Sequence, residues 1–218
     1  MCFDWHPDFK ISVVGATGGL VGDTVIICGG DGGPLKRVDE CYSLTSEKAT
    51  IVTHMSVKRE NAASIVLDGN ILWVTGGSGS VSGVVVQHAS TEYVTLAGTM
   101  LGPNLPQALT NHAMVAINKT CSMVIGGISA DYSATTYFNE QDRTLFYDHN
   151  EGEWITGPSM MQARMSHAAG IVTDDVTDEP LVAVTGGRYF SSNCWFYLDS
   201  TEILQDGEWV QGKIINTI

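Results

Sequence analysis

The stretch AASIVLDGNILWVTGG, residues 62–77, decides the fold of this chain. It holds two apolar runs of about five residues on either side of an Asp-Gly-Asn turn, and it ends in a glycine doublet. The runs are short, contain valine and isoleucine, and are followed by glycine, which disfavours a helix. Such turn chemistry between β-branched runs predicts a β-hairpin.

The same pattern recurs along the chain. Windows that start at Gly15, Ala62 and His112 align without a gap, and a fourth window from His167 needs only an insertion at its turn. The apolar runs and their doublets are VIICGG (residues 25–30), LWVTGG (72–77), SMVIGG (122–127) and VAVTGG (182–187). A recurrence of about 50 residues indicates a repeat architecture.

A second pair of strands is predicted downstream of each doublet. Aromatic residues mark the third strand at Tyr42, Tyr93 and Tyr147, and tryptophan marks the fourth strand at Trp154 and Trp209. Four short strands in each of four repeats predict an all-β protein.

This order of glycine doublet, tyrosine and tryptophan resembles the kelch repeat, whose unit is one four-stranded blade of a β-propeller. The resemblance implies an all-β, kelch-type β-propeller with four recognisable four-stranded antiparallel blades. The expected blades are at about residues 15–54, 62–103, 112–158 and 167–212, after a leader or surplus strand at 1–14.

The resemblance also implies that the repeat signature is structural. The doublet glycines would let the backbone turn without a Cβ clash, and the large rings would pack between blades. The residues concerned are Gly29, Gly30, Gly76, Gly77, Gly126, Gly127, Gly186, Gly187, Tyr42, Tyr93, Tyr147, Trp154 and Trp209. Partner contacts would then come from the loops between strands.

Closure of the propeller is an open question at this level. Propellers of this family usually close with about five to seven blades, whereas this chain supplies four. Either the chain is a fragment of a larger propeller, or four blades close alone, or the open ends pair with another chain. An unclosed propeller would leave the apolar faces of its outer blades exposed to water.

The composition limits the partners. The chain has 218 residues, of which 11 are basic and 24 acidic, and its formal net charge is −13. Nucleic-acid binding needs a basic face, so we expect no nucleic-acid partner. The sequence has no apolar run of transmembrane length and no signal-peptide pattern at its start, so we expect no membrane partner and a cytoplasmic location.

The five cysteines, Cys2, Cys28, Cys41, Cys121 and Cys194, are widely spaced without a zinc-like pattern. We therefore expect no structural metal and reduced thiols that are buried as small apolar groups. A disulfide between Cys28 and Cys41 stays open if the two lie on neighbouring strands, although a cytoplasmic location disfavours it.

Basic residues near the doublets are candidates for partner binding. Arg59 and Arg164 share a repeat position before the innermost strand, and Arg188 and Tyr189 follow the last doublet. One hypothesis is a basic rim of the three arginines, which would bind the carboxylates of an acidic peptide. The alternative is that these arginines pair with the chain's own carboxylates.

His112 and His167 also share a repeat position, at the entrance to the innermost strand. They either line the mouth of the propeller channel as partner-binding residues or hydrogen-bond the backbone. The longer loops at residues 128–142 and 188–200 carry several aromatic side chains, which can act as binding anchors.

By resemblance, we expect a non-catalytic protein–protein interaction module that binds a protein partner through its loops, without catalytic residues, metal ligands or cofactor. One alternative is an enzyme similar to the copper radical oxidases built on this fold, although no matching motif of cysteine, tyrosine and histidine is present. Another is a truncated fragment without independent function, against which cooperative unfolding would argue.

Overall fold

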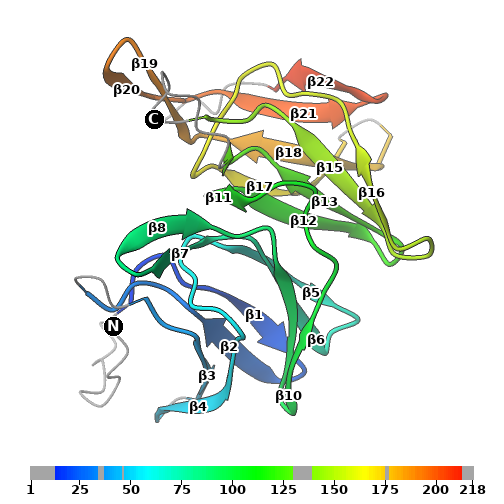
Figure 1. The fold of residues 1–218 in the computed structure, drawn as a ribbon. Helices are drawn as coiled ribbons and strands as arrows, with labels where there is room; N and C mark the ends of the chain where they lie inside the picture. Colours follow the sequence, from blue (N-terminus) through cyan, green and yellow to red (C-terminus); the bar gives the residue numbers. More distant parts are fainter. Residues whose placement is uncertain (1–12, 34–36, 46, 130–138, 175–176, 213–218) are drawn as a thin grey trace, which may run out of the picture. The chain divides into compact units, whose positions relative to one another are not determined.

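The computed structural model describes residues 13–33, 37–45, 47–129, 139–174 and 177–212. Within these ranges the backbone forms strands and turns (Figure 1). The described ranges contain no helix with the length and apolar character needed to cross a membrane. The chain divides into two compact units, Met1–Asn104 and Leu105–Ile218, and each unit contains two four-stranded sheets.

The first unit holds the first two sheets, and all their strand pairs are antiparallel. The first sheet joins β1 (Thr17–Val21), β2 (Thr24–Cys28), β3 (Glu40–Leu44) and β4 (Ala49–His54) in chain order. The second sheet joins β5 (Ala63–Leu67), β6 (Ile71–Thr75), β9 (Thr91–Thr95) and β10 (Gly98–Leu101).

The second unit repeats this arrangement with antiparallel pairs. The third sheet joins β12 (Ala113–Asn118), β13 (Cys121–Ile125), β15 (Thr144–Asp148) and β16 (Glu153–Thr156). The fourth joins β17 (Ala168–Thr173), β18 (Pro180–Thr185), β21 (Thr201–Gln205) and β22 (Glu208–Gln211). This order is that of a propeller blade, so the predicted all-β fold with four-stranded blades is confirmed.

In three sheets, the chain between the second and third strands contains further short strands. Two of these segments are hairpins. β7 (Ser78–Val81) pairs with β8 (Val84–Gln87), and β19 (Arg188–Ser191) pairs with β20 (Cys194–Tyr197). β14 (Ile128–Ser129) pairs instead with β11 (Leu109–Thr110), which lies in the connection into the third sheet. The segment 188–200, expected as a loop, is therefore mostly an ordered hairpin.

Within each unit the two sheets share one apolar core. The core of the first unit contains Val21, Ile26, Cys28, Cys41, Met55, Leu72, Val74 and Val94. The core of the second unit contains Val115, Met123, Ile125, Met160, Val182, Val184 and Trp209. A single sheet exposes such a face to water, so pairing of sheets is what makes each unit stable.

The glycine doublets are required by backbone geometry. All eight have positive φ, from 60° at Gly126 to 104° at Gly30. At Gly127 an added Cβ would also stand 2.7 Å from the carbonyl oxygen of Thr110. Any residue with a side chain would meet both strain and a backbone clash at that position.

The signature aromatic residues do not occupy equivalent positions. In each sheet, one residue of the third strand pairs with the last residue of the second strand. Tyr42 lies one position after that residue in the first sheet, Tyr93 lies two positions after it in the second, and Tyr147 lies three positions after it in the third. Since alternate residues face opposite sides of a sheet, Tyr93 lies on a different face from the other two. Trp209 is buried in the core of the second unit, and the half-buried Trp154 packs on Tyr147 with 4.9 Å between ring centroids. The three tyrosines lie on the third strands of their sheets as predicted, but at different register positions, because spacing from the doublet does not define strand register.

A disulfide joins Cys28 of β2 to Cys41 of β3, and the two residues are direct neighbours across the strand pair. Both are buried as expected, but the expectation of reduced thiols is wrong for this pair. Cys121 and Cys194 are free. Disulfides persist mainly in oxidising compartments, so this bond counts against the expected cytoplasmic location.

Of the predicted leader, residues 1–12 lie outside the described ranges. Val14 exchanges two backbone hydrogen bonds with Asp31, at 3.0 and 2.8 Å. The connections into later sheets do the same, through Glu60 with Ser78 and through Met165 with Arg188. Val14 therefore occupies the place of the connection that precedes each sheet.

Candidate functional site

The polar chemistry of each repeat is concentrated where three segments meet, and we call this meeting point the doublet junction. It consists of the glycine doublet, the connection into the sheet and the start of the sheet's third strand. In the second sheet, the backbone N–H of Gly76 donates to the carbonyl of Ser90 at 3.1 Å. In the fourth, Gly186 donates to Ser200 in the same way at 3.2 Å.

Arg59 fills the doublet junction of the second sheet, where only 1% of it is exposed. Its Nη1 donates to the carbonyl oxygens of Gly76 and Ser90 at 2.6 and 2.9 Å, and its Nη2 donates to Glu92 Oε1 at 2.7 Å. The second carboxylate oxygen of Glu92 accepts from the backbone N–H of Ser56 at 2.6 Å. Burial lowers the pKa of Arg59, and the charge of Glu92 opposes that shift.

Arg164 forms the same network in the other unit. Its Nη1 donates to the carbonyl oxygens of Gly186 and Ser200 at 2.8 and 3.2 Å, and its Nη2 donates to Glu202 Oε1 at 2.5 Å. Glu202 Oε2 accepts from the backbone N–H of Met161 at 2.6 Å. A network that forms twice with the same partners is a feature of the repeat.

The hypothesis of a basic rim is therefore wrong for Arg59 and Arg164. Both guanidinium groups are buried and have their charge paired, so neither can bind an acidic peptide in this structure. The alternative, pairing with the chain's own carboxylates, is what the structure shows. Arg188 is not part of such a junction network, because it lies on the β19–β20 hairpin.

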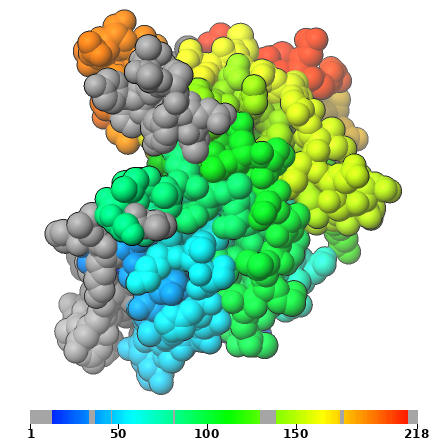
Figure 2. Space-filling view, viewed as in Figure 1, coloured from blue at the N-terminus to red at the C-terminus, as the bar shows by residue number. Residues whose placement is uncertain are grey.

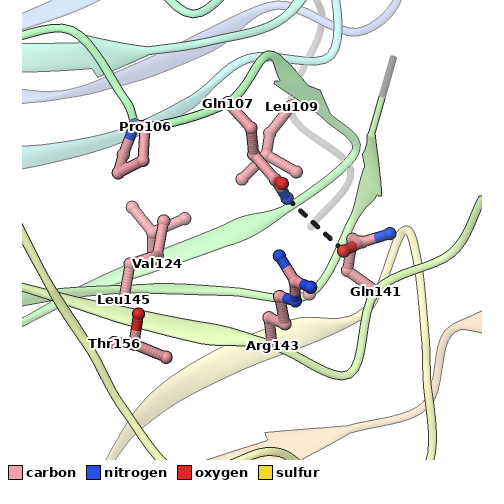
Figure 3. A pocket seen from close by; sticks show the side chains of 9 residues that line it. Pro106, Gln107, Leu109, Val124, Gln141, Arg143, Leu145 and Thr156 are labelled. Atoms are coloured by element: carbon pink, nitrogen blue, oxygen red, sulfur yellow. Dashed lines mark hydrogen bonds between the residues drawn. The ribbon is translucent and has the colours of Figure 1, made fainter. Parts of the chain in front are cut away.

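The doublet junction of the third sheet has a different composition. Leu109 and Leu145 stand where the second and fourth sheets have arginine and glutamate, and Arg143 stands in the place of their serine. A pocket of about 360 Å³ opens here (Figure 3). Its lining residues are Pro106, Gln107, Leu109, Val124, Gly126, Gln141, Arg143, Leu145 and Thr156.

His112 and His167 pack against the doublets of the second unit. A Cβ at Gly127 would lie 2.7 Å from the Cβ of His112, and a Cβ at Gly187 would lie 2.8 Å from that of His167. Burial, with the neighbouring charge of His167, lowers the pKa of His112 to about 3. Burial and the charge of Arg164 lower the pKa of His167 to about 4. Both imidazoles are therefore neutral at physiological pH.

Acidification is expected to destabilise the second unit. In the unfolded chain the pKa of His112 and His167 is about 6.5, so between that pH and about 4 the unfolded state binds protons that the folded state does not. The contribution of the two neutral histidines to the free energy of unfolding is complete above about pH 6.5. It is lost as the pH falls, by up to about 1.4 kcal/mol per pH unit for each histidine. Urea unfolding at about pH 7, 6 and 5 measures this slope. His167→Gln should reduce this slope, and a slope unaffected by His167→Gln would contradict the assignment.

The β19–β20 hairpin carries a ladder of aromatic side chains. The rings of Tyr189 and Phe196 stack with centroids 5.2 Å apart, and the guanidinium of Arg188 lies 4.4 Å from the ring centre of Trp195. Tyr197 is 77% exposed and Phe196 is 43% exposed. In the space-filling view this hairpin, coloured orange, forms part of the molecular surface (Figure 2). The predicted aromatic anchors at residues 130–138 lie outside the described ranges.

The described residues contain no group of three or more histidine, cysteine or acidic side chains placed to hold a metal ion. Glu92 and Glu202 are not among the residues predicted from the sequence, although both occur in a repeated Ser-Thr-Glu motif that indicates them. The pocket of the third sheet was not predicted either, because no local motif marks the replacement of an arginine–glutamate pair by two leucines.

Two comparisons bear on this arrangement. This chain is 32% identical to the Kelch-like protein terF of Aspergillus terreus over an alignment of 123 residues. That alignment covers 54% of this chain and 26% of terF. The chain therefore spans about a quarter of the length of that curated relative. The solved structure of YjhT matches with a TM-score of 0.72 at 17% identity, over 97% of this chain and 68% of that one. No family model matches the sequence.

Four antiparallel blades with glycine doublets define a repeat protein of the β-propeller class. Together with the two comparisons, they show a β-propeller fold that is similar to that of kelch-repeat proteins.

Proposed function

We propose that this chain is a non-catalytic interaction module that binds a protein partner through the β19–β20 hairpin. The observation that carries the proposal is the exposure of Phe196 and Tyr197 on an ordered hairpin. Aromatic side chains and arginine supply most of the binding energy in protein interfaces. The kelch-repeat fold supports the proposal, and the net charge of −13 favours a protein over a nucleic acid as the partner.

The hairpin is anchored before any partner arrives. The backbone N–H of Phe190 donates to Glu140 Oε1 at 2.8 Å, and Arg188 exchanges two backbone hydrogen bonds with Met165, each of 3.0 Å. The stacked pair of Tyr189 and Phe196 holds the rings in fixed positions. Because a fixed side chain loses little entropy on binding, such a hairpin is suited to act as an anchor.

The double substitution Phe196→Ala/Tyr197→Ala is expected to reduce partner recovery at least about tenfold, because it removes two exposed aromatic anchors. Crosslinking of the purified chain in cell extract, followed by quantitative mass spectrometry, measures the recovery of each partner. Val84→Ala/Val85→Ala is the matched control, since these side chains are also exposed, on the β7–β8 hairpin. Equal recovery of all partners by the wild type and the β20 variant would refute the proposal.

The alternative of a copper-dependent enzyme is tested separately. Under the proposed function, purified chain contains no stoichiometric copper, which elemental mass spectrometry measures directly. Stoichiometric copper together with oxidase activity would replace the proposal by the enzymatic alternative.

A further inference from the structure

The pocket of the third sheet lies at the position that the Arg–Glu pair fills in the second and fourth sheets. The backbone N–H of Gly126 donates to the carbonyl of Arg143, as Gly186 does to that of Ser200. Leu145 follows Arg143 by two positions, as Glu202 follows Ser200, so Leu145 corresponds to Glu202. Counting forward from these hydrogen bonds therefore aligns the junctions residue by residue.

The connection into the third sheet aligns in the same way. Thr110 pairs with Ile128 just as Met165 bridges to Arg188, so Leu109, the preceding residue, corresponds to Arg164. Leucine is smaller than arginine and has no donor to offer the carbonyl of Gly126. A pocket of about 360 Å³, lined by Leu109 and Leu145 among others, opens at this junction. This volume is that of a small-ligand site.

The pocket is also lined by one cationic side chain, that of Arg143. Arg143 replaces a serine, and its exposed side chain makes no ion pair with any residue that the structure describes. The side chain of Arg143 lies among the lining residues of the pocket (Figure 3). No carboxylate is among those lining residues. A guanidinium that makes no ion pair with a described residue attracts an anion locally, against the general repulsion from a chain with a net charge of −13.

The remaining walls restrict what the anion can be. Leu109, Val124 and Leu145 form an apolar surface. Gln141 is 8% exposed and held in place, because its Nε2 donates to Asn139 O at 2.9 Å and to Ser129 Oγ at 3.2 Å. Gln107 Nε2 donates to Gln141 Oε1 at 3.4 Å, as the dashed line in Figure 3 shows. The site thus combines one cation, fixed amides and an apolar wall.

We propose that this pocket binds a carboxylate on a short apolar stem. The carboxylate would pair with the guanidinium of Arg143, whose planar donors match its two oxygens, and the stem would lie against Leu109, Val124 and Leu145. The carboxylate comes either from a free organic acid or from a glutamate side chain of a peptide. This site does not depend on the proposed function of the hairpin, and its test uses small probes alone.

Titration of the full ¹⁵N-labelled chain with 4-methylpentanoate tests the site by NMR. We expect saturable shifts at the amides of Gly126, Gln141 and Leu145, with a dissociation constant on the order of 1 mM, and no such shifts with the neutral 4-methylpentanamide. Arg143→Gln should weaken binding at least about tenfold, and Arg143→Lys should weaken it less. Lys119→Gln is the matched control, because it removes one exposed charge of the same unit and should change nothing.

A rebuilt junction provides a second, independent variant. Leu109→Arg/Arg143→Ser/Leu145→Glu restores the composition found in the fourth sheet, so it should fill the pocket and abolish binding while the chain remains folded. The blocked tripeptide Gly-Glu-Gly, compared with Gly-Gln-Gly, distinguishes the sources. If the tripeptide binds more tightly than 4-methylpentanoate, a peptide is the natural ligand, and the reverse order indicates a free acid. Absence of binding by both acids, or binding unaffected by Arg143→Gln, would overturn the proposal.

Discussion

Replacing Arg164 by methionine is expected to destabilise the second unit by about 3–5 kcal/mol, because it leaves the buried carboxylate of Glu202 without its cation. The carboxylate is only 3% exposed, so water cannot replace the lost partner. The carbonyl oxygens of Gly186 and Ser200 lose their arginine donor in the same step. Urea unfolding at about pH 7, followed by tryptophan fluorescence, measures the change.

The chain itself supplies the control for this experiment. Leu109 and Leu145 show that the same junction can be built from two leucines in the third sheet. The double substitution Arg164→Leu/Glu202→Leu should therefore cost much less than the single one, since replacing a whole buried pair by apolar groups is often nearly neutral. If the single substitution cost less than about 1 kcal/mol, the ion pair would not have the role assigned here.

Removal of the disulfide is expected to destabilise the first unit by about 3 kcal/mol. The bond between Cys28 and Cys41 closes a loop with a sequence separation of 13, which restricts the unfolded chain. Cys28→Ala/Cys41→Ala should give this loss in urea unfolding, and a thiol reductant should give a similar loss in the wild type. The reductant should have no further effect on the double variant.

Cys121→Ala is the control for this second experiment, because Cys121 is a free and partly exposed thiol in the other unit. It should leave the unfolding of the first unit unchanged. Insensitivity of the wild type to the reductant would show that the two thiols of the first sheet are not joined in solution.

The strands and their grouping could be predicted from the sequence because the signals are local. Apolar runs with short turns and glycine doublets specify hairpins within windows of about 16 residues, and the recurrence of the windows specifies the blades. The equivalence of the aromatic residues could not be predicted in this way. It depends on strand register, which is set by pairing between segments separated by loops of different lengths.

The roles of the arginines could not be predicted for a related reason. Arg59 and Arg164 are recognisable as a repeated pair, but their burial depends on Glu92 and Glu202, which lie 33 and 38 residues away in the sequence. A charged residue is exposed by default, so position alone does not identify which carboxylate, if any, each arginine meets. Only the folded junction shows that each guanidinium meets a carboxylate and two carbonyl oxygens.

The amino-acid sequence by itself determined that this chain forms four antiparallel blades of kelch type, because β-branched runs, turns and glycines act over a few residues. The tertiary structure decided which of its conspicuous residues are available to a partner. The junctions of the second and fourth sheets are closed by a buried ion pair, the first sheet contains a disulfide between its second and third strands, and the junction of the third sheet is open. These differences arise because burial and charge pairing depend on side chains that meet only after the strands have paired.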